Sequence, residues 1–396
     1  MEFGFTAEEQ TFAEEVRAFL RANPPESFPE TGMDAGYGSG PHSRAFLEAL
    51  GARGWLSMCW PRHYGGQALP MMRKLILLEE LAAGGAPFGP LAGCDQVADA
   101  IIGYGSEALR RDVLPRIARG DATFWQGFSE PGAGSDLLAL KTRARRDGDH
   151  YVVDGHKIWS SHAGIADYGL VLARTDPSAP RHRGLSMLVV DNRLPGMDIR
   201  PIRNMTGKVY HYETFIDNVR VPTDYLLGRE NEGFAQLLRG LDTDRFWGRF
   251  YKPASMRRIL GQLVDYANAT MVRGLPLSRD PVIRRRLAEV ATDIAAVRIL
   301  FYRIGWMIEH EMPVTAESPL AKVMADETGQ KLMALGMEML GSYAPLREGS
   351  RWARLGGQIQ HLYQTSLGHT IAGGASEILR TTVATRGLGL PSERAR

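Results

Sequence analysis

The stretch DHYVVDGHKIWSS (149–161) decides the fold class, because its apolar and polar residues alternate as they do along a half-buried strand. Within it, Asp154-Gly155 is a strong signal for a two-residue hairpin turn. More β-rich runs follow at 168–175, 184–191 and 209–222, divided by Pro, Gly and Asn turns. Together they predict a compact antiparallel β domain of roughly 100 residues in the middle of the chain.

Helical patterns precede this β domain. A Thr6-x-x-Glu9 capping box opens a first helix, whose apolar residues recur at helical spacing. Similar patterns return at 43–54 and 71–83, and the Pro- and Gly-rich segment 24–42 before them is predicted to be a loop.

Long helical patterns also follow the β domain, at 232–273, 281–311 and 317–341, and the helical texture continues to about residue 387. Such a series predicts an antiparallel four-helix bundle. The predicted fold is therefore mostly α with a β middle domain: an N-terminal helical domain (1–121), an antiparallel β domain (122–231) and a C-terminal helical bundle (232–396).

The composition is that of an ordinary globular protein, with 44% hydrophobic and 23% charged residues. A formal net charge of +2 gives no electrostatic reason to expect a nucleic-acid partner. Two cysteines cannot build a disulfide framework, and the sequence has no signal peptide, no membrane-spanning run and no metal-ligand spacing. We therefore expect a cytoplasmic protein with neither a nucleic acid nor a membrane as partner.

The segment FWQGFSEPGAGSDL (124–137) contains the strongest candidate for a ligand-binding loop. It ends a predicted strand and enters Pro131-Gly132-Ala133-Gly134, where two residues without a Cβ let a ligand approach the backbone. Ser129 and Ser135 add neutral donors, which suit a planar heterocycle with carbonyl groups or a pyrophosphate. The loop is neither a GxGxxG nor a Walker motif, so nicotinamide and ATP binding are not indicated. A plain β-turn remains the alternative.

The motif KIWSS (157–161) places an aromatic side chain and two hydroxyls on a predicted strand. Trp159 has two interpretations. It packs in a core, or it flanks a flavin ring while Ser161 donates a hydrogen bond to the polar atoms of that ring.

These two segments, GFSEPGAGSD (127–136) and KIWSS, resemble the flavin-binding pair of the acyl-CoA dehydrogenases. Further similarity to that family follows the chain in order and keeps the helical–β–helical arrangement. It lies in CWPRHYGGQ (59–67), DNVRVP (217–222), TIAGGASEILR (370–380) and RGLGLP (386–391).

The resemblance implies that an FAD lies between the β domain and the bundle, and that the reaction is α,β-dehydrogenation of an acyl-CoA. It also implies an electron-transfer flavoprotein as acceptor and a homo- or hetero-oligomer, a dimer or a tetramer. WPRHYGG, TIAGGASEILR and RGLGLP are most similar to the bacterial branch that handles branched, cyclic, aromatic or steroid-derived thioesters.

The resemblance also assigns residues to the cofactor. Ser135 additionally lies near the substrate, and Arg273 binds the pyrophosphate of a neighbouring subunit's FAD, although Leu275-Pro276 departs from the family pattern just after it. Gly341-Ser342 stands where the family has a glycine pair for the adenine half. The implied cofactor contacts are Gln126, Phe128, Ser129, Gly134, Ser135, Trp159, Ser160, Ser161, Arg273, Gly341, Gly374 and Glu377.

The base that removes the α proton is predicted to lie on the first bundle helix. Many family members carry a glutamate in the late turn, but this chain has Gly373 there. A second branch carries the base in an L-D-x-E-R context, which here reads Leu241-Asp242-Thr243-Asp244-Arg245.

Helical spacing supports Asp244 independently. Phe234, Leu237, Leu238 and Leu241 form one apolar stripe, and Asp244 continues it inward. A carboxylate on such a stripe is costly unless it is paired or functional. The alternative is an Asp–Arg network that holds the helix, and by resemblance Asp242 and Arg245 contact the pantetheine arm.

Two other functions remain open. The first alternative is a non-catalytic or half-site subunit of a mixed oligomer, and the missing late-turn glutamate favours it. The second alternative is a flavin monooxygenase on the same fold. A base at Asp244 argues against the monooxygenase, because oxygen insertion needs no α-proton base.

Overall fold

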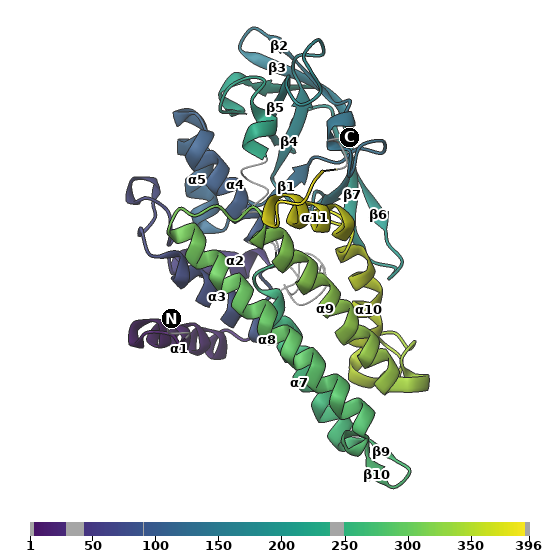
Figure 1. Cartoon of the computed structure of the whole chain (residues 1–396). Coiled ribbons are helices and arrows are strands. Elements are labelled where there is room, and N and C mark those ends of the chain that lie inside the picture. Colours follow the sequence, from purple (N-terminus) through teal and green to yellow (C-terminus); the bar gives the residue numbers. More distant parts are fainter. Residues whose placement is uncertain (1–3, 29–42, 90, 238–248, 393–396) are drawn as a thin grey trace.

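The computed structural model describes residues 4–28, 43–89, 91–237 and 249–392 (Figure 1). It has a helical N-terminal region, a β-sheet middle and a helical C-terminal region, which confirms the predicted fold class. Among the described helices, none is long and apolar enough to cross a membrane.

The N-terminal region forms helices where the sequence predicts them. The Thr6 hydroxyl accepts from the Glu9 N–H, and the Glu9 side chain accepts from the Thr6 N–H, so the capping box is confirmed. Phe12 and Val16 are buried on the inner face of the first helix. The helices of this region are α1 (Ala7–Ala22), α2 (Arg44–Ala52), α3 (Met71–Ala83), α4 (Leu91–Tyr104) and α5 (Glu107–Arg119).

The middle region is one sheet with the strand order β6-β7-β3-β2-β4-β5-β8. Most neighbours are antiparallel, as predicted, but β1 pairs parallel with β4, and β2 meets β4 in parallel at one residue pair. The strands are β1 (Phe124–Gly127), β2 (Arg143–Asp147), β3 (His150–Ser161), β4 (Tyr168–Arg174), β5 (Leu185–Asp191), β6 (Met197–Arg203), β7 (Val209–Pro222) and β8 (Leu226–Leu227).

The predicted hairpin turn at Asp154-Gly155 is wrong. The turn between β2 and β3 is Gly148-Asp149, and Asp154-Gly155 lies inside β3 at a register shift against β7. A Cβ on Gly155 would overlap the Thr142 side chain, so glycine is required there for close packing rather than for a turn. The Asp154 carboxylate accepts from the Asn218 N–H (2.8 Å) and thereby fixes the bulge.

The C-terminal region is built mainly from long helices, with α8 beside α7 and α9, and α10 beside α9. The predicted helical segment 232–273 is only partly right: residues 233–237 are helical, α7 begins at Lys252, and a short hairpin follows Ala269. The elements are α7 (Lys252–Ala269), β9 (Met271–Val272), β10 (Leu275–Pro276), α8 (Pro281–Glu309), α9 (Glu317–Leu340), α10 (Gln358–His369) and α11 (Ser376–Thr382).

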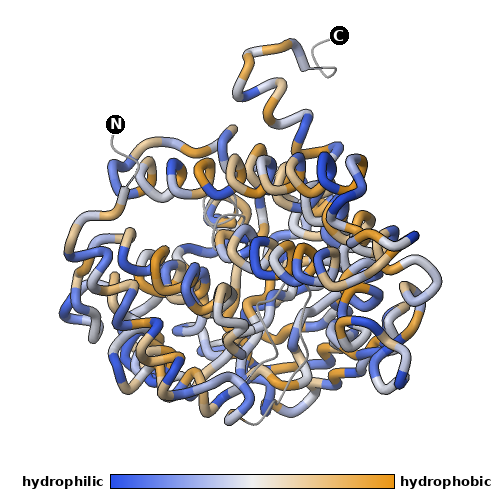
Figure 2. Tube along the Cα trace, turned by 90° about the horizontal axis from the view of Figure 1, so that it is seen from below, coloured by the Kyte–Doolittle hydropathy of each residue, from blue (hydrophilic) through white to orange (hydrophobic). Residues whose placement is uncertain are grey.

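The N-terminal helices join the other two regions. Helices α1–α3 share a hydrophobic core with α7 and α8, whereas α4 and α5 share one with the sheet. At the first junction the buried Glu79 of α3 accepts two bonds from Arg298 of α8 (2.7 and 3.0 Å) and one from Tyr302. After α11 the chain leaves the body, as Figure 2 shows, and Leu388 and Leu390 are exposed there.

Candidate active site

The predicted ligand loop follows β1 and is anchored by Glu130. Glu130 and Ala133 exchange backbone hydrogen bonds (2.9 and 3.0 Å), which folds Pro131-Gly132 into a tight turn. A Cβ at Gly132 or Gly134 would meet no protein atom within 4 Å, so packing within the protein does not explain these glycines. Gly134 and Ser135 are exposed, which leaves the loop open to a ligand.

A buried ion pair beneath this loop, between Glu130 and Lys157, was not predicted from the sequence. The Glu130 carboxylate accepts from the Lys157 ammonium (2.9 Å) and from the N–H groups of Lys141 (2.6 Å) and Thr142 (2.9 Å). Lys157 also donates to the Phe128 carbonyl (3.3 Å). Burial lowers the pKa of Lys157 to about 8, although the charge of Glu130 opposes that shift.

Trp159 lies beside the same loop, at an irregularity of β3. The pairing of β3 with β7 shifts register between Lys157 and Ser160, and Trp159 takes a left-handed backbone conformation with φ of 61°. This conformation is unfavourable for tryptophan, and Trp159 is 57% exposed. The neighbouring Ile158 N–H donates to the Ser129 carbonyl (3.0 Å). The two motifs that the sequence analysis linked to flavin are therefore adjacent.

The two serines after Trp159 differ in exposure. Ser160 is fully buried, and its Oγ has no hydrogen-bond partner among the described residues, whereas Ser161 is half-buried. An unpartnered buried hydroxyl costs roughly 1–3 kcal/mol.

Gln126 and Phe128 connect the loop to the N-terminal helices. The Gln126 side-chain amide donates to the Gln96 side chain of α4, and Phe128 packs against the core that α4 and α5 share with the sheet. Gln96 was not predicted, because nothing in its helical context distinguishes it from a surface glutamine.

Two charged side chains donate hydrogen bonds to backbone carbonyls of the late turn, residues 369–376. Lys322 of α9 donates to the carbonyls of His369 (2.9 Å) and Gly374 (2.7 Å), and Arg249 donates to the Ala372 carbonyl (3.0 Å). Glu377 lies in the first turn of α11 and is exposed. The sequence motif predicts this turn, whereas the contacts of Lys322 and Arg249 with it depend on segments far away in the chain.

The buried carboxylate of Asp326 lies close to three cations, two of which, Lys322 and Arg249, also contact the late turn. Asp326 lies 2.6 Å from Lys252, 2.9 Å from Lys322 and 3.7 Å from Arg249. Burial alone would raise the pKa of Asp326, but the neighbouring cations outweigh burial and lower it. Burial lowers the pKa of Lys252 to about 8 against the attraction of Asp326.

Two predicted cofactor residues lie elsewhere. Arg273 and Gly274 form the tip of the β9–β10 hairpin, at the end of the bundle away from the sheet (Figure 1). Gly341 ends α9 and is exposed. The structure does not bring either residue to the 128–135 loop of its own chain, and a role toward another subunit stays a prediction.

The predicted base and its neighbours, Asp242, Asp244 and Arg245, lie outside the described residues. The helical stripe that leads toward them is partly visible. Leu237 is buried and Phe234 is half-buried, and both pack against the core between α4, α5 and the sheet. The stripe is thus confirmed as an inward face where it is described.

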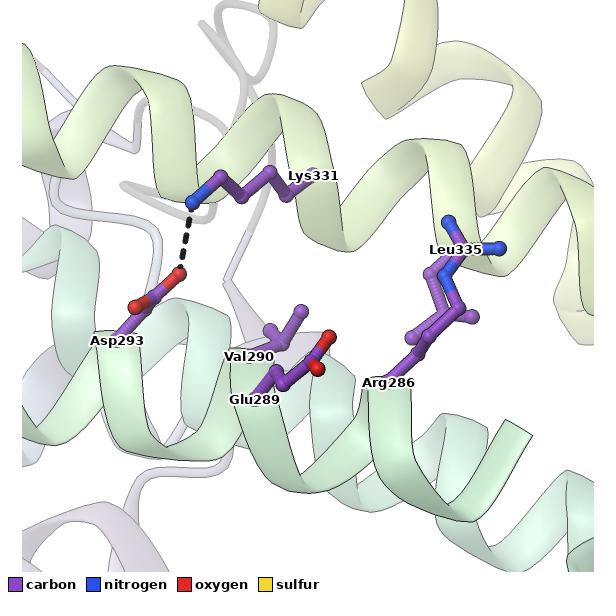
Figure 3. Close-up of a pocket in the computed structure, with 6 residues that line it drawn as sticks. All are labelled: Arg286, Glu289, Val290, Asp293, Lys331 and Leu335. Carbon is purple, nitrogen blue, oxygen red and sulfur yellow. Dashed lines mark hydrogen bonds and ion pairs between the residues drawn. The ribbon is translucent and has the colours of Figure 1, made fainter. Parts of the chain in front are cut away.

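A groove of about 390 Å³ lies between α8 and α9, apart from these motifs (Figure 3). Asp293 and Lys331 form an ion pair across it (3.0 Å). None of the residues predicted to hold flavin or substrate lines it. Its lining residues are Arg286, Glu289, Val290, Asp293, Lys331 and Leu335.

Comparison with known proteins covers the whole chain. Family models of the acyl-CoA dehydrogenase N-terminal, middle and C-terminal domains match residues 6–121, 126–219 and 231–388. The chain is 33% identical to Acyl-CoA dehydrogenase FadE26 of Mycobacterium tuberculosis, over 99% of both chains.

Solved structures give the same result. The Tcur3481-Tcur3483 steroid ACAD is 32% identical, with a TM-score of 0.89 over 99% of this chain and 100% of that chain. The ChsE4-ChsE5 complex from Mycobacterium tuberculosis is also 32% identical, with a TM-score of 0.86 over the same shares.

The helical–β–helical fold, together with the matching family models and relatives, shows a flavoprotein oxidoreductase. The chain belongs to the acyl-CoA dehydrogenase family, whose members in general depend on FAD.

Proposed function

We propose that this chain binds FAD and removes an α proton and a β hydride from an acyl-CoA, which leaves a 2,3-unsaturated thioester. The observation that supports this proposal most is the junction of the 128–135 loop with the Trp159 bulge. That junction combines exposed backbone, unobstructed glycines and an exposed indole, and this combination fits a flat ring with polar edges. Bound FAD supplies the acceptor for the two electrons that leave with the β hydrogen.

The remaining chemistry belongs to the protein. Asp244 is proposed to take the α proton; loss of water on substrate binding would raise its basicity toward that of the acidified carbon. Asp242 and Arg245 are proposed to hold the pantetheine arm, and Ser135 to contact the substrate. Aspartate reaches less far than glutamate, and a misplacement of about 1 Å costs on the order of 10²-fold in rate. Three explanations follow from the shorter reach of Asp244: the backbone compensates for it, the acyl group sits differently, or the subunit is impaired.

The proposed acyl group is branched, cyclic or steroid-derived. The similarity to a steroid ACAD at 32% identity over nearly the full length supports this class. The proposed acceptor is an electron-transfer flavoprotein, and the proposed working state is an oligomer.

A second candidate is a half-site subunit of a mixed oligomer. It is favoured by Gly373 in the late turn, where many family members carry a glutamate, and by similarity to the ChsE4-ChsE5 complex. No observation on the described residues favours a flavin monooxygenase.

One experiment tests both candidates. The chain is purified alone, its visible absorbance is recorded, and linear, branched and steroid-side-chain acyl-CoAs are titrated anaerobically. Bleaching of a flavin band by a cyclic or steroid-derived thioester is expected. A colourless chain that turns yellow only with a second subunit would favour the half-site candidate.

Asp244→Asn is expected to retain flavin and to lose bleaching, whereas Asp265→Asn, at an exposed position of α7, serves as the matched control. Bleaching at the parent rate in Asp244→Asn would exclude Asp244 as the base.

A further inference from the structure

Gly373 in the late turn faces the side chain of Arg249. A Cβ at this position would lie 2.5 Å from Nη2, 3.0 Å from Nη1 and 3.1 Å from Cζ of that guanidinium. The Gly373 backbone also has φ of 65°, which side chains disfavour. The guanidinium therefore occupies the space in which any side chain of residue 373 would begin.

Arg249 cannot easily leave this space. Its side chain is only 11% exposed, donates to the Ala372 carbonyl (3.0 Å) and lies 3.7 Å from the fully buried Asp326. Lys322 reaches the same Asp326 (2.9 Å) and donates to the carbonyl two residues further along the turn, that of Gly374 (2.7 Å). Two cations on one carboxylate thus fix the carbonyls on both sides of Gly373.

We propose that Arg249 is a positioning residue of the active site, which anchors the late turn. By filling the space beside Gly373, it leaves no room at position 373 for a side chain that could take the α proton. The part about proton removal rests on the proposed function. The contact between Arg249 and residue 373 does not, so the two parts fail separately.

The contact is tested by unfolding, without substrate or flavin. Gly373→Ala should lower the melting temperature more than Gly349→Ala, because Gly349 also has positive φ but has no atom within 4 Å of its Cβ position. Arg249→Ala should recover part of the loss caused by Gly373→Ala, so that the two changes are not additive. Equal losses at residues 373 and 349, or additive effects, would overturn the proposed contact.

The part of the proposal that concerns proton removal is tested by moving the carboxylate base from residue 244 to residue 373. In an Asp244→Asn background, Gly373→Glu alone should not restore bleaching, because Arg249 fills the space. Adding Arg249→Ala should raise the bleaching rate on the order of 10²-fold, the usual scale of general-base catalysis. The introduced carboxylate would take the α proton, and bound FAD would accept the β hydrogen with its electron pair, so the products would match those of the parent reaction.

Two results would refute the catalytic part. One is bleaching by Asp244→Asn/Gly373→Glu with Arg249 in place, and the other is a folded, flavin-loaded triple variant that bleaches no faster than Asp244→Asn. Arg257→Ala replaces Arg249→Ala in the control, because Arg257 lies on α7 and its side chain is 60% exposed. If none of the thioesters bleaches the flavin band of the parent chain, the proposed function has failed. The unfolding test then still decides whether Arg249 contacts residue 373.

Discussion

The β domain and the bundle both support the site with a buried lysine and a buried carboxylate, but the two clusters differ in charge balance. In the β domain, Glu130 is paired with Lys157 alone among the described cations, and backbone N–H groups fill its remaining capacity. In the bundle, Asp326 faces Arg249, Lys252 and Lys322.

This difference shows how each loop depends on its anchor. In the first cluster Glu130 and Lys157 balance each other's charge. If either side chain is lost, the other stays buried and charged but keeps its hydrogen bonds to the backbone. The second cluster rests on one carboxylate, and its loss would leave several cations close together in a dry environment. The late turn should therefore be the more fragile of the two loops.

The largest effect is expected from Asp326→Asn. Removing one partner of a buried ion pair costs about 3–5 kcal/mol, and here the carboxylate serves three cations. Urea unfolding should show a loss at or above this range. Asp293→Asn, which breaks the half-exposed pair with Lys331, should cost less than about 1 kcal/mol. Equal losses in the two variants would show that the Asp326 cluster is not buried in solution.

A smaller loss is expected from Lys157→Met. Glu130 would stay buried but would keep the N–H groups of Lys141 and Thr142, so we expect a cost of about 2–3 kcal/mol. Because the loop would loosen, FAD should also bind at least about tenfold more weakly, as measured by fluorescence titration of the apoprotein. Adding Glu130→Gln should recover part of the stability. Unchanged FAD affinity in Lys157→Met would contradict the anchoring role.

A pH effect follows from Lys157 and Lys252, two buried lysines whose pKa is lowered. Burial lowers the pKa of Lys157 and Lys252 from 10.5 to about 8, so above pH 8 the unfolded chain binds more protons than the native chain. Stability should therefore rise with pH, by at most about 1.4 kcal/mol per pH unit for each lysine.

The rise in stability with pH should end near pH 9. Burial raises the pKa of Cys59 from 9.0 to about 11 and that of Cys94 to about 12, so above pH 9 the native chain keeps protons that the unfolded chain loses. Urea unfolding between pH 8 and pH 9 measures the slope, and Lys157→Met should reduce it by about half. A slope that is unaffected by this substitution would assign the titration to other groups.

Local sequence patterns predicted most of the fold. The bounds of α3 and β7 agree with the predicted 71–83 and 209–222, because periodicity and turn residues act within a few positions. The family motifs also pointed to the 128–135 loop and the Trp159 strand as a pair, and the structure brings these two segments together.

What could not be predicted depends on contacts between distant segments. Asp154-Gly155 has the composition of a turn, and only its contact with Thr142 requires a bulge instead. Lys322 and Asp326 have the i, i+4 spacing of an ordinary surface pair on a helix, yet Lys322 reaches carbonyls some fifty residues later in the chain. Sequence periodicity cannot show which helical face another segment will cover.

The smallest effect concerns the backbone of Trp159 and is best measured by comparing two substitutions. Trp159→Gly and Trp159→Ala both remove the indole, but only alanine keeps a Cβ in the left-handed conformation with φ of 61°. The glycine variant of the apoprotein should therefore be more stable than the alanine variant by about 1 kcal/mol, which reverses the usual preference for alanine within a strand. Both variants should lose FAD affinity to a similar extent, because both lack the exposed ring beside the loop. If alanine were the more stable, β3 would run straight through this position in solution, and the indole would not be directed toward the ligand loop by the bulge.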